Sequence, residues 1–71
     1  MEIKFVERLN ELMKENSHNQ VTLAKKSGIA QNTISAWLSN KKEPSITSLW
    51  LLADCFDTNI DYLVGRKKYD T

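Results

Sequence analysis

The segment 20–39 constrains the fold more than any other part of the chain, because one glycine divides it into two short helical patterns. Gly28 stands where the first pattern must end, four residues after the small Ala24. A residue without a Cβ adopts positive φ at little cost, so the chain can reverse direction sharply there. The segment therefore predicts a helix over 20–27, a tight turn, and a second helix over 31–39.

The second of these patterns has an apolar side that faces back toward the first. Ile34, Trp37 and Leu38 recur at i, i+3 and i+4, which marks the inner face of a helix. Ile29 is expected to be a buried turn residue. Where two helices cross near a right angle, only a small side chain lets their axes approach, and Ala24 meets that need. This arrangement is a helix-turn-helix motif.

The remaining sequence predicts three more helices, over 2–16, 46–56 and 60–64. With 71 residues, two glycines and one proline, the chain fits one compact all-α domain of five helices over 1–65. The polar stretch 66–71 is expected to be a frayed tail or the start of a linker. The predicted core stripes are Phe5, Leu9, Leu12 and Met13 in the first helix, Ile46, Leu49, Leu52, Ala53 and Phe56 in the fourth, and Ile60, Leu63 and Val64 in the fifth.

Several polar residues are placed to begin or end these helices. Either Ser17 or Asn19 can cap the helix that starts at residue 20, and Ser45 can cap the fourth helix. Asn40 tolerates left-handed geometry and can end the helix over 31–39. Gly65 is expected to end the last helix.

Charge is distributed unevenly along the chain, although the net charge is only +1. The window 17–42 carries four lysines, Lys25, Lys26, Lys41 and Lys42, and no acid, whereas 43–65 carries four acids and no base. The acid-free window coincides with the helix-turn-helix and the loop after it. Chance in a small protein is one explanation, and a surface for a polyanion is the other.

The outward positions of the helix over 31–39 are small or polar, and none is charged. They are Gln31, Asn32, Ser35 and Ala36. Amides pair with adenine N6 and N7, hydroxyls pair with several base edges, and a methyl group can pack on the thymine methyl. A helix that serves only solubility would carry Glu and Lys there. This face is therefore expected to meet nucleic acid, or alternatively another protein.

Two further positions each allow two interpretations. Gln20 lies in the first turn of its helix, where it can meet a phosphate or can be an ordinary polar residue. Trp50 and Leu51 add apolar area to a helix that already has a complete core stripe. Either Trp50 covers the edge of the core, or Trp50 and Leu51 form part of a surface for a partner protein.

The sequence offers no chemistry typical of an enzyme. Cys55 is the single cysteine and His18 the single histidine, and no second ligand lies at a metal-binding spacing from either. His18 is expected to be a solvent-exposed loop residue and Cys55 a packing residue. There is no glycine-rich phosphate loop or nucleophile–base pair. We expect no cofactor, metal, membrane span or small-molecule ligand, and a cytoplasmic location.

Linked motifs over 5–66 resemble the phage repressor and Cro family of DNA-binding domains, also called the XRE-type helix-turn-helix family. The residues that carry the resemblance are N-Q-x-x-L-A-x-x-x-G-I over 19–29, Q-N-T-I-S-x-W over 31–37, K-K-x-P-S-I over 41–46, and L-x-x-L-A-x-x-F-x-x-x-I-D-Y-L over 49–63. The resemblance implies that Gln31, Asn32, Ser35 and Ala36 read bases. It implies phosphate-backbone contacts from Gln20, Thr33, Ser39, Asn40, Lys41 and Lys42.

Three positions depart from the family pattern. Ala30 replaces the usual hydroxyl cap of the recognition helix, Asn40 replaces the more usual glycine, and Ala36 is smaller than the contacting residue often found there. A less firmly fixed helix start and weaker direct readout are therefore expected.

The function expected from these features is that of a prokaryotic or phage-encoded transcriptional regulator. It would be a repressor that binds double-stranded DNA as a homodimer, on pseudo-palindromic half-sites about 34 Å apart. One rival is the DNA-binding antitoxin of a toxin–antitoxin pair, which would hold its toxin around Trp50 and Leu51. The other is a protein-interaction module without a DNA role, against which the acid-free window argues.

Overall fold

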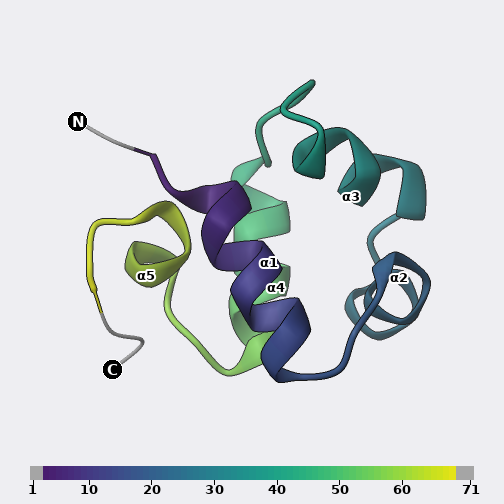
Figure 1. The fold of residues 1–71 in the computed structure, drawn as a ribbon, viewed down its shortest axis with the longest axis horizontal. Coiled ribbons are helices and arrows are strands. Elements are labelled where there is room, and N and C mark those ends of the chain that lie inside the picture. Colours follow the sequence, from purple (N-terminus) through teal and green to yellow (C-terminus); the bar gives the residue numbers. More distant parts are fainter. Residues whose placement is uncertain (1–2, 69–71) are drawn as a thin grey trace.

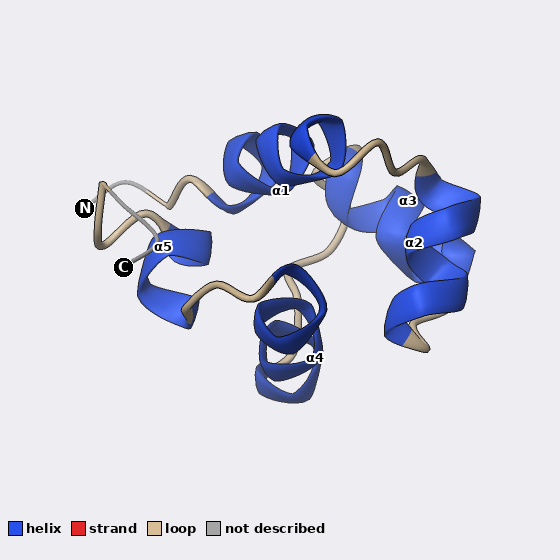
Figure 2. Cartoon of the chain, turned by 90° about the horizontal axis from the view of Figure 1, so that it is seen from below, coloured by secondary structure: helices blue, strands red, loops and turns tan. Residues whose placement is uncertain are grey.

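Each stretch of helical periodicity forms a helix in the structure, a computed structural model that describes residues 3–68 (Figure 1). The helices are α1 (Phe5–Glu15), α2 (Gln20–Ser27), α3 (Gln31–Leu38), α4 (Ile46–Phe56) and α5 (Ile60–Val64). Within the described residues there is no strand, and the all-α, five-helix prediction is confirmed. Figure 2 shows α2 and α3 together at one end of the molecule and α5 at the other, with α1 and α4 between them.

Most helices begin at a side-chain cap that the sequence supplies. Asn19 and Thr22 form a reciprocal capping box on α2, in which Asn19 Oδ1 accepts from the Thr22 N–H at 2.9 Å. Ser17 instead lies in the preceding turn with a φ of 56°, which decides between the two cap candidates. Ser45 caps α4, and Asn59 caps α5. Local sequence thus fixes where these three helices start.

The start of α1 differs from the prediction, which placed it at Glu2, outside the described residues. Lys4 has a non-helical backbone, with φ −106° and ψ 25°, and its N–H donates to the Val64 carbonyl at 3.1 Å. A Cβ on Gly65, which has a φ of 94°, would lie 2.9 Å from the Lys4 Cβ. The chain before α1 is therefore held against the end of α5, and helix begins only at Phe5.

The core lies between the five helices, each of which contributes buried side chains. Trp37 of α3 is almost fully buried and meets the Phe5 ring edge-on, with ring centroids 5.5 Å apart and an interplanar angle of 81°. The described core comprises Phe5, Leu9, Leu12, Met13, Leu23, Ile29, Ile34, Trp37, Leu52, Phe56, Tyr62 and Leu63. The expected α1 stripe and the buried Ile29 are confirmed.

Two expectations about burial are wrong, and one buried residue was missed. Ile46 was placed in the core stripe of α4, but its side chain is 81% exposed, because it lies in the first turn whereas the buried Leu52 and Phe56 lie in the second half. Tyr62 is buried, although the stripe predicted for α5 omitted it. His18 is half-buried rather than solvent-exposed, since its ring meets the Phe56 ring edge-on with centroids 6.0 Å apart.

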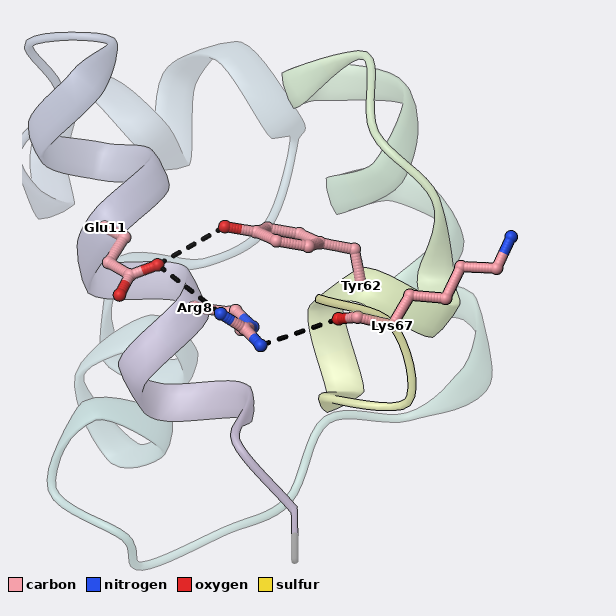
Figure 3. Close-up of polar contacts among 4 residues, drawn as sticks. All are labelled: Arg8, Glu11, Tyr62 and Lys67. Carbon is pink, nitrogen blue, oxygen red and sulfur yellow. Dashed lines mark hydrogen bonds and ion pairs between the residues drawn. The ribbon is translucent and has the colours of Figure 1, made fainter. Parts of the chain in front are cut away.

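Polar side chains join α1 to α5 at the far end of the molecule (Figure 3). The Arg8 guanidinium lies over the Tyr62 ring, 4.6 Å from its centroid, and donates to the Lys67 carbonyl at 3.5 Å. Glu11 Oε2 accepts from the Tyr62 hydroxyl at 3.3 Å and lies 3.8 Å from Arg8 Nη1. We call Arg8, Glu11, Tyr62 and the Lys67 carbonyl the α1–α5 junction. Of the predicted tail over 66–71, Lys67 contacts Arg8 through its carbonyl, and residues 69–71 lie outside the described part of the chain.

Candidate nucleic-acid interface

The turn between α2 and α3 is fixed from inside by one hydroxyl and one glycine. Ser27 is buried, and its Oγ donates to the Leu23 carbonyl at 2.7 Å and accepts from the Ile29 N–H at 3.2 Å. Gly28 has a φ of 77°, as the sequence predicts. The role of Ser27 was missed, although a hydroxyl residue directly before the terminating glycine was a usable signal. This turn sets the angle at which α3 leaves α2.

The two sides of α3 have opposite character. Ile34 and Trp37 are buried, whereas Gln31, Asn32 and Ser35 are exposed. Within residues 3–68, these three exposed side chains make no hydrogen bond. Their amide and hydroxyl groups are thus available to an external partner. An unpaired amide row on a rigid helix is what base-edge recognition in a major groove requires.

Two other residues predicted on this face are less accessible. Thr33 and Ala36 are half-buried, so each offers only part of its side chain. Ala30 makes no side-chain cap bond at the start of α3, and its backbone is extended, with φ −61° and ψ 140°. The backbone N–H groups of the first turn therefore lack the side-chain partner that α2, α4 and α5 have.

The loop after α3 continues the same surface. Asn40 adopts a φ of 61°, as predicted, and donates its N–H to the Trp37 carbonyl at 3.0 Å. The Lys41 N–H then bonds to the Ala36 carbonyl at 2.9 Å, which holds the loop against the helix. Ser39 is exposed, but its hydroxyl already donates to the Ser35 carbonyl at 3.0 Å. The loop places exposed Lys41 and Lys42 directly beyond the end of α3.

The residues expected on α2 lie next to this surface. Gln20 is half-buried in the first turn of α2, and Lys25 and Lys26 are exposed in its last turn. Among residues 3–68, none of the four lysines of the acid-free window forms an ion pair. The α2–α3 corner, by which we mean these two helices and the loop through Lys42, is therefore an uncompensated basic surface.

Trp50 and Leu51 lie on α4, apart from the α2–α3 corner. Trp50 is 63% exposed, and Leu51 is 38% exposed. A tryptophan that covers the edge of the core would be mostly buried, so the exposure of Trp50 favours the other interpretation, a partner surface, which stays a prediction.

The described residues contain no sign of a metal site or a membrane span. In residues 3–68, no group of three or more His, Cys, Asp or Glu side chains could hold a metal ion, and no helix is long and apolar enough to cross a bilayer. Cys55 is half-buried, and burial raises the pKa of its thiol, with nearby Lys26 acting in the opposite direction. A raised pKa lowers the reactive thiolate fraction, which suits a packing residue.

This fold and this exposed helix define a class of protein. Residues 9–63 match the helix-turn-helix family, so the chain belongs to that family. Among curated proteins, it is 40% identical over 63 residues to the HTH-type transcriptional regulator AnsR of Bacillus subtilis, covering 89% of this chain and 54% of that protein. It is 31% identical over 61 residues to the uncharacterized HTH-type transcriptional regulator YobD of the same organism, covering 86% and 54%.

A solved structure agrees with this assignment. The crystal structure of a transcriptional regulator from Listeria innocua superposes with a TM-score of 0.82 at 29% identity, covering 97% of this chain and 64% of that one. The XRE-type family prediction is thus confirmed. The chain spans about half the length of the curated relatives that it matches. These relatives are named as regulators and not as enzymes.

Proposed function

We propose that the chain is a sequence-specific module that binds double-stranded DNA in a transcriptional regulator, with α3 in the major groove. One observation carries the proposal: the side chains of Gln31, Asn32 and Ser35 are exposed and make no hydrogen bond within residues 3–68, whereas the other side of α3 is buried in the core. The names of the relatives support a role in transcription, and family membership supports DNA as the ligand.

In this proposal the two sets of contacts have separate tasks. Gln31, Asn32, Ser35 and the Ala36 methyl group read base edges, and amides there favour adenine. The phosphate backbone is met by Gln20, Thr33, Ser39, Asn40, Lys41 and Lys42, which fix register without carrying sequence information. One α3 reads only a few base pairs, so a homodimer on half-sites about 34 Å apart supplies specificity. A bound dimer would repress in the prokaryotic cytoplasm by blocking access to the promoter.

Selection of bound sequences from a random duplex pool tests the proposal directly. We expect an enriched motif with two inverted A·T-containing half-sites. The variant Q31A/N32A should lose the enrichment, whereas Asn10→Ala, which removes an exposed amide from α1, should keep it. If the chain, shown to be folded by circular dichroism, enriches no motif, the proposal is wrong.

The salt dependence of binding tests the electrostatic part. Lys25 and Lys26 add to the sequence-independent attraction that Lys41 and Lys42 exert on phosphates. Four lysines that each neutralise one phosphate would give a slope of about −3.6 per copy in log K against log salt concentration. Lys41→Gln should make the slope shallower by about one, on every DNA sequence. Lys14→Gln, an exposed lysine of α1, is the matched control and should leave it unchanged. Equal slopes for all three proteins would remove Lys41 from the phosphate contacts.

A further inference from the structure

One buried hydroxyl joins the end of α2 to the chain beyond the turn. Ser27 Oγ donates to the Leu23 carbonyl, four residues back, and accepts from the Ile29 N–H, two residues ahead. The first bond is local and common for a serine in a helix. The second crosses the helix end, and within residues 3–68 the Ile29 N–H has no other acceptor. One serine can fill both roles because its hydroxyl carries a donor hydrogen and two acceptor lone pairs.

The side chains that α2 and α3 bury against each other are apolar and do not select one crossing angle. Leu23 and Ile34 are fully buried and share the core with Ile29. Hydrophobic burial is non-directional, whereas a hydrogen bond weakens steeply as its angle departs from linear. Close packing does not fix the turn from outside either, because a Cβ on Gly28 would meet no atom within 4 Å. The directional contact across the turn is therefore the hydroxyl of Ser27.

The angle between α2 and α3 matters because the proposed DNA contacts lie on both helices. Gln20 is expected at a phosphate, and Gln31, Asn32 and Ser35 at base edges. Gln20 lies seven residues before Ser27, a distance of about 10 Å along a helix. At that radius a tilt of about 10° moves Gln20 by about 2 Å relative to α3, whereas a functional site tolerates about 0.5 Å. A small tilt therefore prevents the two sets of contacts from forming together.

We propose that Ser27 is a positioning residue for base recognition: its hydroxyl fixes the angle between α2 and α3, and this angle sets how well the chain discriminates between DNA sequences. The inference rests on the proposed function. Because Ser27 is buried, it acts through Gln31 and Asn32 and does not contact DNA itself. Attraction of phosphates to the long side chains of Lys41 and Lys42 is independent of sequence and tolerates a tilt. Loss of the hydroxyl should thus weaken cognate binding more than binding to unrelated DNA.

Residual dipolar couplings of the backbone amides test the positioning role without any DNA. Ser27→Ala removes both bonds and leaves the Ile29 N–H without its acceptor. We expect the angle between α2 and α3 to change by about 10° or more, or the couplings of α3 to be reduced by averaging, while α1 and α4 keep their relative orientation. Ser27→Thr keeps a hydroxyl that can bond to a carbonyl four residues back and should restore the angle.

Two results of this measurement would overturn the proposal. One is an angle in Ser27→Ala equal to that of the unsubstituted chain. The other is an equal change in Ser27→Ala and Ser27→Thr, because the angle would then depend on side-chain volume and not on the hydroxyl.

A second arm measures discrimination on DNA, as the ratio of dissociation constants for a duplex with one altered base pair and for the selected duplex. Ser27→Ala should lower this ratio about tenfold, as expected for the loss of one base contact, and Ser27→Thr should restore it. Affinity for unrelated DNA should change less than about twofold. Arg8→Ala, which weakens the distant α1–α5 junction, controls for a general loss of stability and should keep the ratio. All four proteins are compared at a temperature where circular dichroism shows them folded.

The two arms separate failure of this inference from failure of the proposed function. Unchanged discrimination in Ser27→Ala, or an equal loss in Arg8→Ala, would overturn the positioning role and leave the DNA assignment intact. An unsubstituted chain that discriminates no sequence would overturn the proposed function and, with it, the role of the angle in recognition. The dipolar couplings would still show whether the hydroxyl of Ser27 fixes that angle.

Discussion

The α2–α3 corner and the α1–α5 junction are both places where short helices meet, but they use polar side chains in opposite ways. At the junction, the side chains of Arg8, Glu11 and Tyr62 bond to one another and to the Lys67 carbonyl, while Arg8 Nε is buried without a hydrogen-bond partner within residues 3–68. At the corner, the contact between helices is apolar and the one buried hydroxyl, that of Ser27, bonds to backbone groups. Within residues 3–68, the side chains of Gln31, Asn32 and Ser35 have no intramolecular hydrogen-bond partner.

This difference indicates which surface is structural and which is available for recognition. Polar side chains that bond within the molecule lower its free energy but cannot bind a ligand without breaking those bonds. A helix that is held only by its apolar side can bind a ligand with its polar side without first breaking intramolecular hydrogen bonds. Four substitutions test whether the two regions differ in this way.

Trp37→Ala should have the largest effect, because the indole fills the centre of the corner and contacts the Phe5 ring. Truncating a fully buried aromatic costs about 3–5 kcal/mol of unfolding free energy, most of what a 71-residue domain has. Urea unfolding followed by circular dichroism measures the loss. A loss of unfolding free energy as small as that expected for an exposed residue would contradict the conclusion that apolar packing holds the α2–α3 corner. Trp50→Ala is the matched control, since that indole is mostly exposed.

Gln31→Ala should weaken binding to the selected cognate site by ~1–3 kcal/mol and relax the base preference at one position. The unfolding free energy should change by less than about 0.5 kcal/mol, because the side chain makes no hydrogen bond within residues 3–68. Fluorescence anisotropy with cognate and mutated duplexes, together with urea unfolding, separates the two quantities. An unchanged preference would remove Gln31 from the base-reading residues.

Arg8→Ala should destabilise the protein by about 1 kcal/mol, because it removes the cation–π contact with Tyr62 and the apolar stem that packs beside it. Its ion pair with Glu11 adds little, since Glu11 is 46% exposed. Arg8→Met should recover part of the loss by restoring the stem. DNA affinity should not change for either variant, and a change would show that the two regions are coupled.

High pH should produce the smallest effect, at the junction. Burial raises the pKa of Tyr62 above its ordinary value, the nearby Glu11 carboxylate raises it further, and Arg8 opposes them. The protonated Tyr62 hydroxyl therefore contributes fully to the unfolding free energy below pH ~10. This contribution is lost as the pH rises through the pKa of Tyr62 in the folded protein. Tyr62→Phe should show a shallower loss of unfolding free energy between pH 9 and about 11. Parallel curves would mean that the tyrosine ionises as in the unfolded chain.

Most of the fold could be predicted from the sequence, because the features that indicate helices and their ends are local. Gly28, Asn40 and Gly65 mark positive φ where the structure has it, and periodicity identified each helix to within a few residues. Ile46 was assigned wrongly because periodicity gives a direction around a helix, but not how far neighbouring helices extend along it. Tyr62 was missed because its burial depends on Arg8 and Glu11, more than 50 residues earlier in the chain.

For the candidate site, the sequence indicated which residues face outward, but not how accessible each one is. The exposure of Gln31 and Asn32 follows from helical spacing alone. The half-burial of Ala36 accompanies the loop that folds back on it, through the bond from the Lys41 N–H to the Ala36 carbonyl. The bond from the Ser39 hydroxyl to the Ser35 carbonyl, four residues earlier, is local. The choice between the two interpretations of Trp50 likewise required the packing of α4.

The hydrogen bond from the Lys4 N–H to the Val64 carbonyl has a consequence for the order of the helices along the chain. It brings the start of α1 to the end of α5 (Figure 1). A short peptide could join these two points and the chain could be reopened between α4 and α5, so that α5 precedes α1. Such a circular permutant should keep the same packing and the same recognition surface, since a domain whose ends lie close together tolerates a new order of its elements.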